Sequence, residues 1–167
     1  MGVVVMKRSE KEIPFRVSQG NVSIPERLKF LNKTQRQAVL ATIADRVPFT
    51  SLIAYAMTPD MKKLIFATPK DTTKYRNILK MNQIAVLIDT RSKTGSAYLE
   101  TEAITILGKA KPLQRGKEWS DLVEKFIKKH PKLTGFVKSP TTALVVVELN
   151  HCFHVSRFQT VSEWHVK

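Results

Sequence analysis

The sequence of 167 residues is long enough for one domain with a sizeable core, and its 43% hydrophobic and 25% charged residues are ordinary for a globular protein. A single cysteine, Cys152, excludes an intrachain disulfide and so argues against a small secreted scaffold. No apolar run is long enough to span a membrane, and residues 1–6 lack the preceding basic residues of a signal peptide. We therefore expect a cytoplasmic protein without a membrane segment.

The net charge of +14 comes from 28 Lys and Arg residues against 14 Asp and Glu residues. Such a charge attracts anionic ligands and can indicate nucleic-acid binding. The basic residues, however, are spread along the chain, and few aromatic residues lie among them as a single-strand platform would require. A nucleic-acid-binding barrel stays open as an alternative, and a basic surface without nucleic acid is favoured over it.

In the first half of the sequence we expect an N-terminal extension followed by helices and strands. Residues 1–22 lack periodicity, so we expect an N-terminal extension before a single domain over residues 23–167. Ser23 and Glu26 have the spacing of a capping box, which predicts a helix over residues 23–38. Apolar and β-branched runs predict strands over 38–43, 49–57, 63–68 and 84–88, with turns at 45–48 and 58–60 and a short helix over 72–80 capped by Asp71.

The second half adds strands and one amphipathic helix. A long strand is predicted over 98–112, with Gly108 as a bend or bulge. Apolar residues on one face predict a helix over 115–130, and further strands are predicted over 143–149 and 151–158. Strands in hairpin-like succession with few helices indicate a mainly β fold, a closed or nearly closed barrel with peripheral helices.

The segment around the short helix carries the clearest chemical signal. A strand ends near Thr68, and Thr72, Thr73 and Lys74 follow at the expected helix start. Free backbone N–H groups, hydroxyls and a cation there can hold a phosphate, so we expect a phosphate-bearing ligand. The alternative is a capped helix with a solvated lysine.

A metal site at residues 151–154 is not expected. On a strand, Cys152 and His154 share one face and His151 lies on the other, and two ligands do not make a zinc site. We therefore predict no metal ligand, and Cys152 is expected to be a packed residue without a nucleophilic role.

Several short segments in a fixed order together resemble the pyridoxamine 5'-phosphate oxidase-like family of FMN-binding split barrels, over residues 25–167. The segments are residues 40–43, 48–53, 66–68, 72–78, 84–92, 106–110 and 156–159, with Trp164 near the end. The resemblance implies a six-stranded split β-barrel and a homodimer with FMN in a groove at the subunit interface.

The resemblance also implies site residues, by position. The phosphate is expected at Thr72, Thr73 and Lys74 with support from Thr68, and Arg91 and Ser92 are expected near ribityl or ring oxygens. The flavin ring is expected at Thr50, Ser51, Leu52 and Ile53, and Gln159 and Trp164 are expected to arrive from the other subunit.

The sequence departs from the family pattern in two places that bear on function. Thr50 and Thr73 stand where many relatives have arginine, so Lys74 is expected to be the main phosphate cation, assisted by Arg76 or Lys70. The substrate-binding Arg and His pattern of true pyridoxamine phosphate oxidases is not evident, so vitamin B6 oxidation is not implied.

The function implied is an FMN-binding, flavin-dependent oxidoreductase whose substrate, electron donor and catalytic groups cannot be read from the sequence. Two alternatives stay open: a non-catalytic flavin carrier for electron transfer, and the basic nucleic-acid-binding barrel. A deazaflavin or haem in the same barrel is a further alternative for the ligand.

Overall fold

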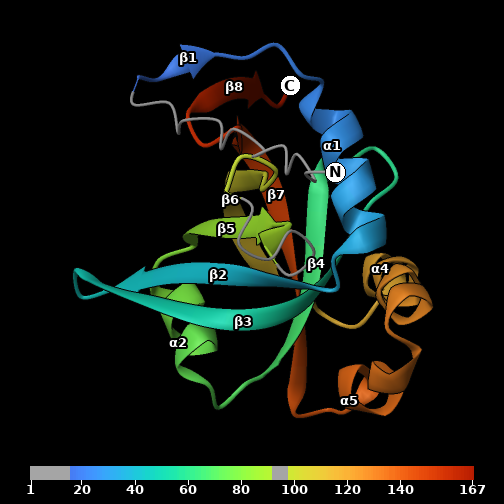
Figure 1. Cartoon of the computed structure of the whole chain (residues 1–167). Coiled ribbons are helices and arrows are strands. Elements are labelled where there is room, and N and C mark those ends of the chain that lie inside the picture. Colours follow the sequence, from blue (N-terminus) through green and yellow to red (C-terminus); the bar gives the residue numbers. More distant parts are fainter. Residues whose placement is uncertain (1–15, 92–97) are drawn as a thin grey trace, which may run out of the picture.

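A closed antiparallel β-barrel forms the centre of the protein (Figure 1), and the computed structural model describes residues 16–91 and 98–167. The strands follow the order β7-β4-β3-β2-β5-β6, and β6 pairs back onto β7 to close the barrel. Its six strands are β2 (Gln37–Ala44), β3 (Val47–Met57), β4 (Lys63–Pro69), β5 (Gln83–Asp89), β6 (Ala103–Pro112) and β7 (Thr142–Ser156). The predicted mainly β, six-stranded split barrel with peripheral helices is confirmed.

The barrel opens between β3 and β4. Their pairing ends at Tyr55 and Phe66, whereas β3 continues to pair with β2 as far as Val47. Helix α2 (Thr73–Lys80) packs against β2 at this end of the barrel, where Asn77 Nδ2 donates a hydrogen bond to Thr42 Oγ1 at 3.1 Å. The connection between β4 and α2 is therefore fixed to the barrel at both ends.

The remaining elements lie around the barrel (Figure 1). They are β1 (Ser18–Gln19), α1 (Ile24–Thr34), α4 (Lys117–Lys129), the 3-10 turn η1 (Pro131–Leu133), α5 (Thr134–Lys138) and β8 (Thr160–His165). Strand β8 extends the sheet beyond β7 as an antiparallel neighbour, and β1 pairs with β8 in parallel. Within the described residues, no helix combines the length and apolar character needed to cross a membrane.

Two hydrophobic clusters form the core. One fills the barrel and includes Leu28 and Leu31 of α1. The other joins the buried face of α4 to the outside of the sheet, where Phe126 belongs to the same cluster as Ile65 and Val146. Since both faces of β4 and β7 are covered, these strands read as continuous apolar runs in the sequence. The predicted amphipathic face of α4 is confirmed.

A lysine side chain joins α4 to α1 beside this core. Lys129 Nζ lies 3.6 Å from the centroid of the Tyr55 ring and donates to Asn32 Oδ1 at 3.0 Å. Burial, with a smaller contribution from the nearby charge of Arg36, lowers the pKa of Lys129 to about 7. The Lys129 side chain therefore takes part in the packing of α4 against α1 and is not part of the candidate functional site.

A polar cluster ties α1 to the barrel. Glu102, just before β6, accepts a hydrogen bond from Arg27 of α1 and lies 2.8 Å from Nε2 of His154, a buried residue of β7. Burial opposes the charge of Glu102, but the hydrogen bonds from Arg27 and His154 outweigh it and hold the pKa of the carboxyl below its ordinary value. The three residues are far apart in sequence, so no local pattern predicts their contact.

The backbone confirms one predicted turn and one predicted bulge. Asp45 and Arg46 both have positive φ, 52° and 65°, as the hairpin between β2 and β3 requires. The pairing of β6 with β7 shifts register between Leu107 and Gly108, and a Cβ at Gly108 would lie 2.5 Å from the carbonyl oxygen of Glu148. Gly108 is thus a bulge position that leaves no room for a side chain.

Several predicted boundaries are wrong. The first helix ends at Thr34 and not at residue 38, residues 98–102 are not a strand, and Thr72 takes the N-cap position predicted for Asp71. The two strands predicted over 143–149 and 151–158 are one strand, β7, and the last strand is β8. The pattern misses β8 because its residues are mixed polar and apolar and because the preceding turn uses no glycine.

Candidate functional site

The site begins with the turn between β4 and α2, which its hydroxyl groups stabilise. The Oγ1 atoms of Thr68 and Thr72 are 2.9 Å apart, and Thr72 Oγ1 also donates to the carbonyl oxygen of Pro69 at 2.9 Å. Thr72 occupies the N-cap position but its side chain makes no capping hydrogen bond. The first N–H groups of α2 therefore lack the usual side-chain acceptor and are available to an anion.

The cations predicted near this turn behave differently from one another. Lys74 is half-buried, and its Nζ makes no hydrogen bond or ion pair with any residue in 16–91 or 98–167. Arg76 donates to the carbonyl oxygen of Asp71 at 2.6 Å and to Thr73 Oγ1 at 3.2 Å, so its guanidinium lies beside the helix start. Lys70 instead donates to the carbonyl oxygen of Pro140 at 2.9 Å. Lys74 and Arg76 are therefore the cations best placed for an anion at α2.

Strand β3 presents the predicted ring-binding residues on its two faces. Ile53 is buried in the barrel core. Ser51 pairs with Leu40, and its buried Oγ has no hydrogen-bond partner within the described residues. An unpaired buried hydroxyl is unfavourable, and a polar ligand or water at this position would satisfy it.

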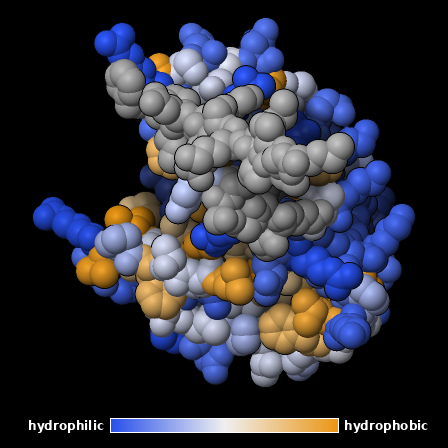
Figure 2. Space-filling view, in the orientation of Figure 1, coloured by the Kyte–Doolittle hydropathy of each residue, from blue (hydrophilic) through white to orange (hydrophobic). Residues whose placement is uncertain are grey.

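Thr50 and Leu52 lie on the outer face of the barrel, and Leu52 is 61% exposed. Leu52 lies beside Val39, which also pairs with Leu87, so an apolar row crosses three strands. Figure 2 shows hydrophobic side chains gathered over β2 and β3 at the left and lower part of the view.

A hollow of about 350 Å³ lies over this outer face. Val39, Leu52 and Leu87 form its apolar part, and Arg36, Asp89 and Arg91 add charged groups to its lining. Arg91 Nε lies 3.2 Å from Asp89 Oδ1, so the arginine is held at this edge of the hollow. Ser92, which is predicted to accompany Arg91, lies outside the described residues.

The two residues expected from a second subunit lie in another part of the fold. Gln159 is in the turn after β7, and Trp164 of β8 packs against the barrel core of its own chain. Figure 1 shows β8 and α2 at opposite ends of the molecule. Within one chain neither residue meets the α2 turn, and their contact with a ligand of another subunit stays a prediction.

The structure therefore brings Thr68, Thr72, Thr73 and Lys74 together, with Thr50 to Ile53 on a neighbouring strand. Sequence reasoning missed Asn77, which anchors α2 to Thr42, and Arg36 and Asp89 in the hollow. The polar Asn77 on the buried face of a short helix is the one sequence signal that could have indicated such an anchor.

Comparison with known proteins agrees with this architecture. The family model described as pyridoxamine 5'-phosphate oxidase matches residues 24–155, which is most of the chain. The chain belongs to the pyridoxamine 5'-phosphate oxidase family. No curated protein sequence matches it.

Solved structures share the fold at low sequence identity. A haem-binding protein from Mycobacterium smegmatis has a TM-score of 0.76 at 14% identity, over 87% of this chain and 59% of that protein. A FAD-binding protein from Mesorhizobium loti has a TM-score of 0.65 at 15% identity, over 80% of this chain and 92% of that one. The haem storage protein HutZ from Vibrio cholerae has a TM-score of 0.67 at 12% identity, over 77% and 92%. The likeness establishes the common fold, and the ligands differ among these proteins.

Proposed function

We propose that the protein binds FMN and is a flavin-dependent oxidoreductase of its family. The observation that carries the proposal is the first turn of α2, which contains N–H groups without a side-chain cap, the Thr73 hydroxyl and the unpaired Lys74. The buried Ser51 hydroxyl of β3, which has no hydrogen-bond partner in the described residues, is a second polar group that a bound ligand could satisfy. Family membership supports a phosphate-bearing cofactor at this position.

Different residues bind the phosphate and the ring of the cofactor. Lys74 and Arg76 hold the phosphate by charge, and the N–H groups of α2 fix its orientation. Leu52 and Val39 offer an apolar surface beside which the ring can lie, shielded from water, while Thr50 and Arg91 offer polar groups to its edge. FMN itself supplies the electron chemistry when bound. No side chain is assigned as a general acid or base.

The visible spectrum of the protein as purified tests the choice of cofactor. We expect the two-band spectrum of an oxidised flavin, with FMN as the compound released on denaturation. Haem is the second candidate, because two proteins of the same fold are haem proteins by name. A Soret band with no flavin bands would contradict FMN as the cofactor and would support haem.

We also propose that the protein is a homodimer joined through the outer face of β2, β3 and β5. This face carries the apolar row at Leu52, whose side chain is 61% exposed. A ligand on this face would then lie between two subunits, as the family resemblance implies. The groups expected from the partner are those near the partner subunit's β8.

Substitution of Leu52 by aspartate tests the dimer. A charge placed in an apolar interface costs on the order of 2 kcal/mol or more, so we expect the dimer dissociation constant to rise more than about tenfold. Sedimentation equilibrium over a range of concentrations measures it. Phe136→Asp on α5, also an exposed hydrophobic residue, is the control and should leave the dimer intact. A wild-type monomer, or an unaffected L52D dimer, would contradict the proposed interface.

Turnover separates an enzyme from a carrier. Steady-state oxidation of NADH or NADPH by the flavin-loaded protein, with an added electron acceptor, would support the oxidoreductase. A flavin that is reduced chemically and reoxidised without turnover of either donor would favour the carrier.

A further inference from the structure

A second cluster of ligand-type side chains lies on the hairpin of β7 and β8, away from the α2 turn. His151 of β7 pairs directly with His165 of β8, and Phe153 pairs with Glu163. Because side chains alternate along a strand, His151, Glu163 and His165 share one face of the hairpin. Cys152 and His154 are buried on the other face, toward the barrel.

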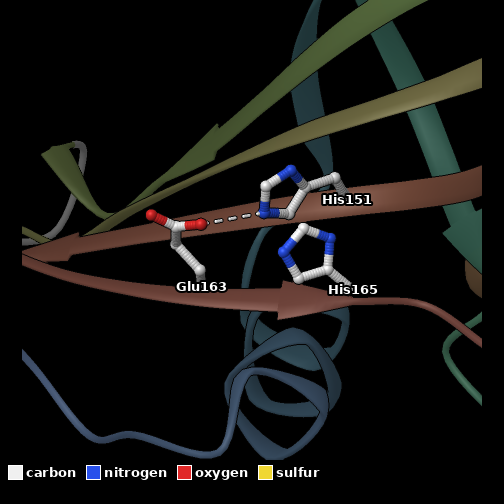
Figure 3. Close-up of side chains that lie close together, drawn as sticks. All are labelled: His151, Glu163 and His165. Atoms are coloured by element: carbon white, nitrogen blue, oxygen red, sulfur yellow. Dashed lines mark hydrogen bonds and ion pairs between the residues drawn. The ribbon is translucent and has the colours of Figure 1, made fainter.

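The three side chains point toward one another (Figure 3). His151 Nε2 lies 3.1 Å from Glu163 Oε2, and the His151 and His165 rings stack with centroids 3.8 Å apart. One ligand atom from each residue lies within 4.8 Å of the others. His151 is partly buried, whereas Glu163 and His165 are exposed, so the group is open to solvent.

We propose that His151, Glu163 and His165 bind one divalent transition-metal ion, with Zn²⁺ as the expected ion. Two imidazole nitrogens and one carboxylate oxygen form a donor set suited to zinc, with metal–ligand distances of about 2.0–2.2 Å, and the fourth position of the tetrahedron stays open to water. Mg²⁺ and Ca²⁺ prefer oxygen ligands and do not fit two imidazoles.

The terminal torsion of a histidine is broad, so the two stacked rings can turn to direct a lone pair at a shared ion. The strand pairing holds the three residues on one face of the hairpin, where side-chain rotation brings their ligand atoms closer together. Glu163 supplies negative charge at the site, which matters in a chain of net charge +14.

This trio differs from the residues 151–154 that the sequence analysis considered and rejected as a metal site. Cys152 and His154 lie close to His151 in the sequence, but both are buried. His151 finds its partners on β8, a strand that the hydrophobic pattern does not predict. Within one chain, β8 lies at the opposite end of the molecule from α2 (Figure 1), so zinc binding by the hairpin is measured separately from FMN binding.

Zinc titration of the untagged full chain, stripped with a chelator, tests the proposal. We expect saturable uptake of one Zn²⁺ per chain by calorimetry, and no comparable uptake of Mg²⁺. His165→Asn and Glu163→Gln should each weaken zinc binding at least about tenfold, since each removes a direct ligand. Glu124→Gln, an exposed glutamate of α4, is the matched control and should bind zinc like the wild type.

Histidine-ring NMR gives a second readout that does not depend on affinity. Zinc should shift the ring signals of His151 and His165 and leave those of the buried His130 and His154 in place. A chain without one-to-one zinc uptake, or one whose uptake is the same in H165N and E163Q, would overturn the proposal. In that case the cluster would form a surface ion pair between His151 and Glu163 and would not bind a metal ion.

Discussion

Replacement of Lys74 by alanine is expected to weaken FMN binding roughly ten- to a hundredfold. The Lys74 ammonium has no partner within the described residues and lies in the first turn of α2, so a phosphate there would gain a charge-assisted hydrogen bond. Such a contact is worth on the order of 1.5–3 kcal/mol, which gives the expected change in affinity. Equilibrium titration of the apo protein with FMN, followed by flavin fluorescence, measures it.

Lys70 provides a matched control for Lys74. Its ammonium group already donates a hydrogen bond to the carbonyl oxygen of Pro140, so K70A should change FMN affinity less than about threefold. The affinity of both variants for riboflavin, which lacks the phosphate, should stay at the wild-type value. If K74A binds FMN as the wild type does, the phosphate does not lie at α2.

Replacement of Glu102 by glutamine is expected to be the most destabilising of the substitutions considered. The Glu102 side chain is 12% exposed and bonds to both Arg27 and His154. Glutamine removes its negative charge and one of its two acceptor oxygens, so Arg27 and His154 can no longer both keep their acceptor. Breaking a buried ion pair costs about 3–5 kcal/mol, and the partial exposure of Arg27 reduces this to about 2–3 kcal/mol. Urea unfolding followed by tryptophan fluorescence measures the free energy of unfolding.

The same variant has a characteristic pH dependence. The pKa of Glu102 is lower in the folded protein than in the unfolded chain, so its stabilising contribution is present above the unfolded value of about 4.3. That contribution is lost as the pH falls through the folded pKa. The difference in stability between wild type and E102Q should therefore be full at pH 7 and shrink toward the acid end of the range.

An exposed glutamate controls for charge removal in general. Glu118 forms a surface ion pair with Lys63 at 3.5 Å, and E118Q should change the free energy of unfolding by less than about 1 kcal/mol at any pH. Equal stability of E102Q and the wild type at pH 7 would show that the Arg27–Glu102–His154 cluster does not hold α1 to the barrel.

The sequence predicted the barrel where local signals were strong. The strands β2 to β5 and the bulge at Gly108 could be predicted directly. Buried strands appear in the sequence as apolar runs, and a position without room for a side chain appears as a glycine. Strand β8 could not be read, since the turn before it places Arg157 and Phe158 at positive φ without glycine or asparagine. The contact of Glu102 with Arg27 and His154 depends on the closed barrel and has no local signal.

The sequence indicated the contiguous part of the candidate site, but it gave no sign of the contacts between elements that surround it. The Thr72 to Lys74 segment is contiguous, so helix-start chemistry and the family resemblance both indicated it. The anchor of Asn77 on Thr42 and the unpaired hydroxyl of Ser51 arise from packing between elements, which spacing alone does not specify. The same reason applies to the histidines of the β7–β8 hairpin.

The ratio of FMN to riboflavin affinity for the apo protein shows whether a flavin phosphate binds at α2. We expect tight, stoichiometric uptake of FMN and binding of riboflavin at least about a hundredfold weaker, because two cations and the N–H groups of α2 act on the phosphate alone. Equal affinities, or no uptake of either compound, would contradict a flavin phosphate at this helix.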